Sequence, residues 1–230
     1  RLGLGPGHPR ALVAGYPVRR ELFEQDKGAC RRAFGLGDEP PVALVYGGSR
    51  GARSLNRAVA ALLPDLLERC ALIHVCGREG DASWLREAAG QLPERLQMRY
   101  KLYEYLSSGE QSMVAAFGAA DLAICRSGAS TLAELPAAGL PAVLVPYPYV
   151  HQDENADYLV LRGAAVKVAD DQMLGPGRPQ DGALFRAVVR LFDDKHERQD
   201  MAERSRALAR PDAARSLAGA LLRLAARSGG

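Results

Sequence analysis

Short apolar runs alternate along the chain with longer segments in which apolar residues recur every three or four positions. The short runs are hydrophobic throughout, which is typical of parallel strands covered on both faces, whereas the longer segments have the period of helices. Strands are predicted at residues 11–14, 41–46, 72–76, 96–103, 122–125, 142–145 and 165–168. This alternation predicts a doubly wound α/β fold in which crossover helices connect parallel strands.

Helices are predicted between these strands. They are expected at residues 20–34, 52–68, 82–91, 111–119, 130–138 and 153–162. Beyond Val168 the pattern changes, because a Gly-Pro-Gly-Arg-Pro segment at 175–179 interrupts the chain. Three amphipathic helices are predicted after it, at 181–192, 195–208 and 212–226, and we expect them to pack along the edge of the sheet.

The predicted elements divide the chain into three parts. Residues 1–18 are interpreted as a linker and first strand, residues 19–210 as a Rossmann-like ligand-binding domain, and residues 211–230 as a C-terminal helix. The segment from Arg1 to Gly7 lacks the charged-then-apolar design of a signal peptide and is typical of a linker or an excised boundary.

Composition and charge exclude several classes of protein. The 230 residues are 47% hydrophobic, which suits a packed core, and a net charge of +3 that is spread along the chain does not indicate nucleic-acid binding. The longest apolar stretches fall far short of the ~20 residues that span a bilayer, so no transmembrane segment is expected. Four cysteines match neither a zinc knuckle nor a redox pair, and we expect buried thiols in a reducing cytoplasm: Cys30, Cys70, Cys76 and Cys125.

A glycine-rich turn, Gly47-Gly48-Ser49-Arg50-Gly51, follows the strand predicted at 41–46. Glycines let a backbone come close to a ligand, and the free N–H groups at the start of the next helix favour an anion. Ser49 adds a hydroxyl donor. By itself such a motif is as often only a tight turn.

A second turn follows the strand predicted at 122–125 and runs from Arg126 to Thr131. Ser130 or Thr131 can cap the next helix, and the N–H groups from Gly128 to Thr131 can receive a phosphate. Glu134 lies about one helical turn further on, where a carboxylate can accept hydrogen bonds from both hydroxyls of a ribose. The alternative is a simple capping arrangement with Glu134 favoured by the helix dipole, and spacing alone slightly favours it.

The chain has neither the lysine pattern of a P-loop nor an Asp-x-Asp pair for a divalent ion, so we expect no metal and no cofactor. The charge of a bound phosphate would then be met by helix ends and by cations. Arg19 is one candidate cation, although an arginine at the start of a helix is usually a solvated surface group. The further candidates are Arg50, Arg53 and Arg126.

A third turn follows the strand predicted at 142–145 and contains His151, Gln152 and Asn155. Sugar hydroxyls both donate and accept hydrogen bonds, so Gln152 and Asn155 are candidates for binding a sugar. His151 is a weak candidate for a catalytic base, because a single histidine before a helix is more often a cap or a surface group.

Five ordered motifs in these turns and strands give the chain a family resemblance. The motifs are Gly-x-Pro-Val-Arg, Gly-Gly-Ser-x-Gly-Ala-Arg-x-Leu-Asn, Ala-Asp-Leu-x-Ile-Cys-Arg-Ser-Gly-Ala-Ser-Thr-x-Ala-Glu-Leu, Gly-Leu-Pro-Ala-x-Leu-Val-Pro-Tyr-Pro and His-Gln-x-x-Asn-Ala. Over nearly its whole length the chain resembles the C-terminal domain of the MurG family. These bacterial transferases add N-acetylglucosamine to undecaprenyl-linked muramyl-pentapeptide, and the resemblance favours ligand binding over the plain interpretation of each turn.

The resemblance implies one half of a GT-B glycosyltransferase, in which residues 19–210 bind UDP-N-acetylglucosamine for an inverting transfer in peptidoglycan synthesis. It implies that Glu134 binds the ribose, that Gln152 and Asn155 contact the sugar, and that Leu106, beside Tyr105 and Met113, lies next to uracil. The other implied ligand-binding residues are Arg19, Ser49, Ser127, Gly128, Ala129, Ser130 and Thr131.

The resemblance also implies what lies outside this chain. The acceptor site and the general base are expected on an N-terminal half, so this chain alone is expected to be inactive, with His151 a poor substitute for the base. The whole enzyme is expected in the cytoplasm, peripheral to the inner face of the cell membrane, where it reaches a lipid-linked acceptor.

Two departures from the family pattern concern the ligand site. Tyr16 stands where the family usually has Asn, and residues 107–112 form a longer stretch than usual between Leu106 and Met113, which makes the uracil contact the weakest assignment. Two alternatives stay open: another GT-B transferase domain or split-enzyme subunit that uses a UDP-sugar, and a non-catalytic module that binds a nucleotide sugar. Comparison of UDP-glucose and UDP-galactose with UDP-N-acetylglucosamine separates the transferases, and a transfer assay with the N-terminal half separates the module.

Overall fold

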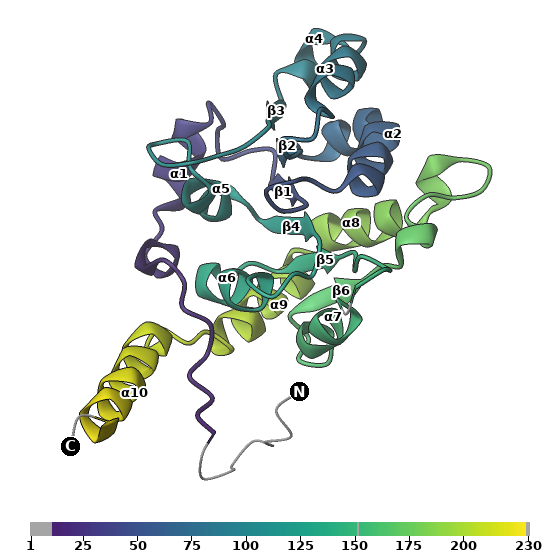
Figure 1. Ribbon diagram of the computed structural model, residues 1–230. Helices are drawn as coiled ribbons and strands as arrows, with labels where there is room; N and C mark the ends of the chain where they lie inside the picture. The colour runs from purple at the N-terminus through teal and green to yellow at the C-terminus, as the bar shows by residue number, and fades with distance from the viewer. Residues whose placement is uncertain (1–10, 151, 229–230) are drawn as a thin grey trace.

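A computed structural model describes residues 11–150 and 152–228 of the chain, which form a parallel sheet flanked by helices (Figure 1). The sheet has six strands in the order β3-β2-β1-β4-β5-β6, and every pair is parallel. The strands are β1 (Val42–Tyr46), β2 (Ala71–Val75), β3 (Tyr100–Tyr103), β4 (Leu122–Cys125), β5 (Ala142–Leu144) and β6 (Ala165–Lys167). The predicted doubly wound α/β fold is therefore confirmed.

Helices connect the strands and continue beyond β6. The α-helices are α1 (Lys27–Ala33), α2 (Arg53–Arg69), α3 (Ala82–Gly90), α4 (Glu94–Gln97), α5 (Met113–Ala119), α6 (Thr131–Ala138), α7 (Asp153–Val160), α8 (Ala183–Asp193), α9 (Lys195–Ala207) and α10 (Ala213–Ser228). Short 3-10 helices lie at η1 (Arg20–Phe23), η2 (Asp170–Gln172) and η3 (Pro179–Asp181). No helix among the described residues combines the length and the apolar character that crossing a membrane requires.

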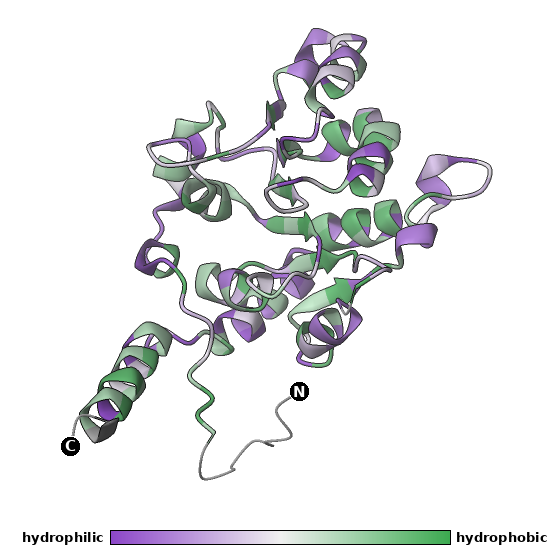
Figure 2. Cartoon of the chain, in the orientation of Figure 1, coloured by the Kyte–Doolittle hydropathy of each residue, from purple (hydrophilic) through white to green (hydrophobic). Residues whose placement is uncertain are grey.

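The four central strands β2, β1, β4 and β5 are buried on both faces, which explains why they are mainly hydrophobic. Alternate residues of β1 point to opposite faces: Leu44 packs in a core with α1, α5, α6 and α7, and Val45 packs in a core with α2 and α8. Figure 2 shows β4, β5 and much of α8 in the hydrophobic colours. The four cysteines are free and buried, as predicted.

The order of the strands determines where a ligand can bind. The chain runs outward from β1 to β3 and then returns to the other side of β1 with β4, so the order reverses between β1 and β4. At such a switch point the turns that leave two adjacent strands diverge and open a crevice beyond their carboxyl ends. Tyr46 and Cys125, the last residues of β1 and β4, are partners in register. The turns after β1 and β4 therefore start side by side.

The prediction of a strand at residues 11–14 is wrong. This segment has no regular secondary structure, and Leu12 and Val13 are 58% and 67% exposed. An apolar tetrapeptide forms a strand only where a neighbouring strand accepts its hydrogen bonds, and the sheet offers it none.

Two other predicted elements are divided in the structure. The helix predicted at 20–34 is split into η1 and α1, because the Asp26 carboxylate accepts a hydrogen bond from Ala29 N–H at 3.1 Å and starts a new helix. The strand predicted at 96–103 begins as α4, and only Tyr100–Tyr103 forms β3.

The prediction that all three helices after β6 pack along the edge of the sheet is wrong. Leu184 and Leu191 of α8 are fully buried in the core on one face, and α9 contacts both α6 and α8. The C-terminal helix α10 extends away from the sheet (Figure 1), with leucines such as Leu222 at 71% exposure. The hydrophobic side of α8 matches the sheet face and not its edge, which is why the prediction failed for this helix.

Candidate functional site

Three turns meet at the carboxyl edge of the sheet, after β1, β4 and β5, as the strand order requires. The turns after β4 and β5 are joined directly: the Ser127 hydroxyl donates to Gln152 O at 2.8 Å, and Asn155 Nδ2 donates to Ser127 O at 2.9 Å. Residues that the sequence placed in two separate turns therefore form one surface.

The glycine turn after β1 is fixed by its contact with the turn after β2. Gly51 has φ +91°, and a Cβ atom on it would lie 2.2 Å from Cys76 O. Gly48 has the same φ but no atom within 4 Å of a Cβ position, and the neighbouring Ser49 is exposed. The turn thus has one side that packs on protein backbone and another that is open to a ligand.

The turn after β4 presents unpaired backbone amides. Neither of the predicted capping hydroxyls caps α6: Ser130 makes no side-chain cap bond, and Thr131 Oγ1 donates back to Arg126 O at 3.2 Å. Thr131 N–H donates to Gly128 O at 3.1 Å. Within residues 11–150 and 152–228, the N–H groups of Gly128, Ala129 and Ser130 have no acceptor. Those three amides and the positive end of the helix dipole form an environment for an anion.

Glu134 lies one turn into α6 with its side chain half-buried. Its carboxylate makes no hydrogen bond or ion pair with any other described residue. A carboxylate left without a partner next to the open amides is available to hydroxyl donors of a ligand.

The turn after β5 fixes the orientation of two side-chain amides. Gln152 Oε1 accepts a hydrogen bond from Tyr147 N–H at 3.0 Å, which leaves its NH2 group free to donate. Asn155 uses its NH2 group on Ser127 O, which leaves its oxygen free to accept. His151 lies outside the described residues. The two amides thus offer one donor and one acceptor, which is what a pair of sugar hydroxyls needs.

Three of the four candidate cations are occupied by protein groups. The Arg126 guanidinium is buried and forms an ion pair with Asp170 at 2.6 Å. Arg50 and Arg53 are exposed and pair with Glu79 at 2.5 Å and with Asp81 at 3.0 Å. The expectation that these three arginines meet a phosphate is not supported by their contacts.

Arg19 is the fourth candidate cation. It is exposed and forms no ion pair with the described residues, and it precedes η1, which contacts α6. Arg19 is therefore the candidate that keeps a free charge on the side of α6.

The structure does not bring the Leu106 side chain to the three turns. Leu106 follows β3, is 4% exposed and packs in the core on the α5 side. Tyr105 is 44% exposed, and Arg78, which the sequence did not single out, lies over its ring at 4.0 Å from the centroid.

The structure also contains a buried polar network behind the glycine turn that the sequence did not indicate. Asn56 Nδ2 donates to Cys76 O at 2.9 Å and to Asp81 Oδ2 at 2.8 Å, so Asn56 Oδ1 accepts from His74 Nε2 at 3.0 Å. His74 Nδ1 must then accept from the Tyr100 hydroxyl at 2.7 Å. Through Asn56 this network anchors α2, and with it the turn that precedes the helix, to the turn after β2.

Acidification is expected to lower the free energy of unfolding because of His74. Burial lowers the pKa of His74 to about 3, against 6.5 for an ordinary histidine, although the Asp81 charge opposes the shift. Above pH 6.5 both folded and unfolded states hold a neutral His74. As the pH falls from 6.5 towards 3, only the unfolded state takes the proton, and stability is lost at up to ~1.4 kcal/mol per pH unit.

Urea unfolding between pH 7 and 4.5 measures this effect. In that window a His74→Gln variant, which keeps a donor and an acceptor, should show a flatter dependence on pH. Equal slopes for the variant and the wild type would contradict the assignment to His74.

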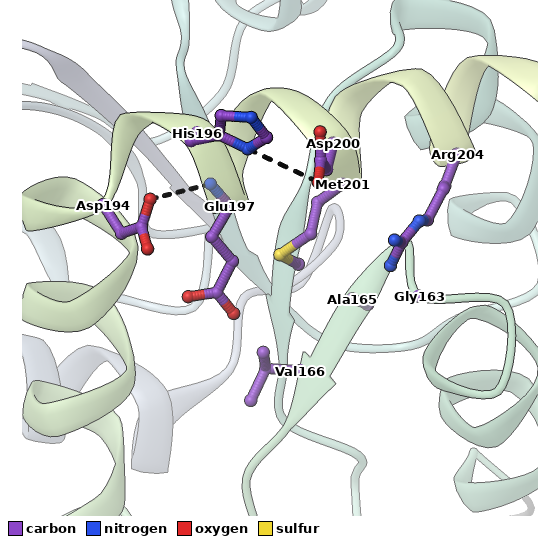
Figure 3. A pocket seen from close by; sticks show the side chains of 9 residues that line it. All are labelled: Gly163, Ala165, Val166, Asp194, His196, Glu197, Asp200, Met201 and Arg204. Atoms are coloured by element: carbon purple, nitrogen blue, oxygen red, sulfur yellow. Dashed lines mark hydrogen bonds and ion pairs between the residues drawn. The ribbon is translucent and has the colours of Figure 1, made fainter.

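Two cavities lie at the opposite, amino end of the sheet. One of 440 Å³ is lined by Gly163, Ala165 and Arg204 among others, where the chain enters β6 (Figure 3). The other, of 640 Å³, contains Pro41 and Asp121, which precede β1 and β4. The surface at the carboxyl edge is thus separate from both cavities. Among the described residues, no group of three His, Cys, Asp or Glu side chains is arranged to hold a metal ion.

The family model and the curated relatives agree on one family. The model of the glycosyltransferase family 28 C-terminal domain matches residues 42–217. A UDP-N-acetylglucosamine--N-acetylmuramyl-(pentapeptide) pyrophosphoryl-undecaprenol N-acetylglucosamine transferase of Roseiflexus sp. (strain RS-1) is 62% identical over 220 residues, which are 91% of this chain and 50% of that protein. The protein of the same name from Desulforudis audaxviator (strain MP104C) is 37% identical over 232 residues, 96% of this chain and 58% of that protein.

Among solved structures, the crystal structure of Acinetobacter baumannii MurG matches with a TM-score of 0.68 and 25% sequence identity, covering 90% of this chain and 57% of that one. The chain therefore spans about half the length of the curated relatives that it matches.

Proposed function

Because the chain belongs to the family of glycosyltransferase family 28 C-terminal domains, we propose that it is the donor-binding half of an inverting GT-B glycosyltransferase. The proposed reaction moves N-acetylglucosamine from UDP-N-acetylglucosamine to lipid-linked muramyl-pentapeptide in peptidoglycan synthesis. The names of the two relatives support this donor and acceptor. The observation that carries the proposal is the row of open amides beside Glu134 at the switch point of the sheet.

The diphosphate of the donor is assigned to the start of α6. The N–H groups of Gly128, Ala129 and Ser130 donate to its oxygens, aided by the helix dipole. Ser49, across the switch point, adds a hydroxyl, and Arg19 adds a charge. Ser127 and Thr131 contribute by holding the turn, because their hydroxyls bond to backbone oxygens.

The uridine and the sugar lie on either side of the diphosphate. Glu134 accepts hydrogen bonds from the two ribose hydroxyls, and uracil lies beside the segment of Tyr105 and Leu106. On the sugar side, the Gln152 amide donates to one hydroxyl and the Asn155 oxygen accepts from another. This division follows from the bonds that already occupy the other ends of both amides.

The chemistry of the transfer divides between the two halves of the enzyme. An acceptor hydroxyl attacks the anomeric carbon, the bond from that carbon to the UDP oxygen breaks, and UDP leaves with the electron pair. The amides at the start of α6 stabilise the negative charge that develops on the diphosphate. The acceptor proton passes to a general base on the N-terminal half, so this chain alone is inactive.

The whole enzyme is proposed to work at the inner face of the cell membrane, because its acceptor is anchored to a lipid. It needs no metal or other cofactor, since helix amides and Arg19 meet the phosphate charge. Its product serves cell-wall growth, and therefore cell shape and division.

Donor binding and reconstituted transfer test the proposal. By calorimetry, the chain should bind UDP-N-acetylglucosamine more tightly than UDP-glucose or UDP-galactose. Combined with a separately produced N-terminal half, it should transfer N-acetylglucosamine to the lipid-linked acceptor. Binding without transfer would favour a non-catalytic module, and preference for another UDP-sugar would favour a different transferase.

Replacing Gln152 with alanine is expected to weaken UDP-N-acetylglucosamine binding by ~1 kcal/mol, because one hydrogen bond to the sugar is lost. The affinity for UDP should stay within about twofold of wild type, since the diphosphate and uridine contacts remain. Calorimetric titration with both ligands measures the difference, and exposed Gln91→Ala is the control. Equal losses for both ligands would remove Gln152 from the sugar contact.

A further inference from the structure

A closed ring of three hydrogen bonds ties together the turns after β1, β4 and β6. Arg126 Nη1 donates to Asp170 Oδ1 at 2.6 Å, and Arg126 Nη2 donates to Ser54 Oγ at 2.5 Å. The Ser54 hydroxyl in turn donates to Asp170 Oδ1 at 2.9 Å. Ser54 lies in the first turn of α2, and Asp170 begins η2 after β6. Each member of the ring therefore comes from a segment that follows a different strand at the carboxyl edge.

The same guanidinium also holds the turn after β5. Arg126 Nη1 donates to Val145 O at 3.0 Å and to Pro146 O at 3.2 Å. These two carbonyls begin the turn that leads to Gln152. Arg126 therefore connects four turns, including the three that form the candidate site.

Because the Arg126 side chain is buried, its charge has to be balanced by these protein contacts. The Arg126 side chain is 7% exposed and that of Asp170 is 22% exposed, so a cation largely removed from water is balanced by one carboxylate and by neutral acceptors. The planar fork of an arginine carries five N–H donors in fixed directions on three nitrogens, whereas a lysine ammonium presents three from a single nitrogen. Because it is buried and paired with Asp170, Arg126 is a structural cation and not a phosphate ligand.

We propose that Asp170 and Ser54 are positioning residues of the donor site, which act through Arg126 to hold the sugar-binding turn beside the phosphate-binding turn. The inference rests on the proposed function. Neither residue lies in the segments assigned to the donor: Asp170 follows β6, and the Ser54 hydroxyl is bonded within the ring. Without the ring, the turn after β5 keeps its bonds to Ser127, but the guanidinium that holds Val145 O and Pro146 O is no longer fixed by Asp170 and Ser54. The sugar contacts therefore depend on the ring more than the uridine contacts do.

Asp170→Asn tests this inference, with Asp171→Asn as a matched control. Asp171 is the adjacent residue of η2, is exposed and makes no contact with Arg126, so its variant has the same change of charge without the change of contact. Titrations use the full chain at a temperature where circular dichroism shows each variant folded. Asp170→Asn should raise the Kd for UDP-N-acetylglucosamine about tenfold and that for UDP less than about threefold, whereas the control changes neither by more than about twofold.

Ser54→Ala provides a second variant that keeps the ion pair. It should raise the Kd for UDP-N-acetylglucosamine about threefold, again more than that for UDP. A purely structural ring would lower the melting temperature of the variants and leave the ratio of the two Kd values at that of wild type, which would overturn the inference. An equal loss in Asp171→Asn would also overturn it. If wild-type protein binds no UDP-N-acetylglucosamine, the proposed function fails and the inference fails with it.

Discussion

Replacing Gly51 with alanine is expected to lower the free energy of unfolding by about 3 kcal/mol or more. Gly51 has φ +91°, which strains any other residue, and the new Cβ would lie 2.2 Å from Cys76 O. The same Cβ would lie 3.1 Å from Cys76 C and 3.2 Å from Gly77 Cα, so the clash is with backbone that has to move. Because this contact fixes the glycine turn, donor binding should be lost with the stability.

Gly48→Ala is the matched control for this substitution. Gly48 also has φ +91°, but no atom lies within 4 Å of its Cβ position, so only the strain of the backbone remains. We expect a loss of ~1–2 kcal/mol. Urea unfolding of both variants separates the steric clash from the strain. Equal losses would show that the two turns are not held together by the contact between Gly51 and Cys76.

Replacing Glu134 with alanine is expected to weaken UDP binding by ~1–3 kcal/mol, since two charge-assisted hydrogen bonds to the ribose are lost. The fold should be unaffected, because the carboxylate has no partner among residues 11–150 and 152–228. Calorimetric titration with UDP gives the affinity, and Glu87→Ala, on the exposed side of α3, is the control.

The two ligands UDP and inorganic pyrophosphate sharpen this test. Pyrophosphate lacks the ribose, so its affinity should be the same for Glu134→Ala and wild type. A variant that binds UDP as tightly as wild type would exclude the ribose contact, and equal losses for both ligands would point to a general effect of charge on the start of α6.

The sequence predicted a strand correctly where both faces of that strand are buried in the core. Residues 122–125 were assigned correctly because both faces of β4 are buried, so hydrophobicity alone marks the strand. Residues 11–14 carry a similar apolar pattern but have no neighbouring strand, and a local pattern does not contain that information. The start of α8 was close to its prediction, yet the face it covers depends on the shape of the whole sheet.

The site was predictable as a set of turns but not as a set of contacts. The carboxyl ends of adjacent strands meet, and the structure joins the turns after β4 and β5 through Ser127 and Gln152, which the sequence had placed in two separate turns. The sequence made Arg126 a candidate phosphate ligand. Its partner in the structure is Asp170, which lies 44 residues away, and only the folded chain brings the two together. The partners of Asn56 were hidden for the same reason, since His74 and Asp81 lie in other elements.

The position of the bound donor tests the central claim most directly. A crystal structure of the chain with UDP-N-acetylglucosamine should show the diphosphate against the N–H groups of Gly128, Ala129 and Ser130, with the ribose hydroxyls on Glu134. Density for the donor at the amino end of the sheet, in the cavity beside Gly163 and Arg204 (Figure 3), would contradict the account.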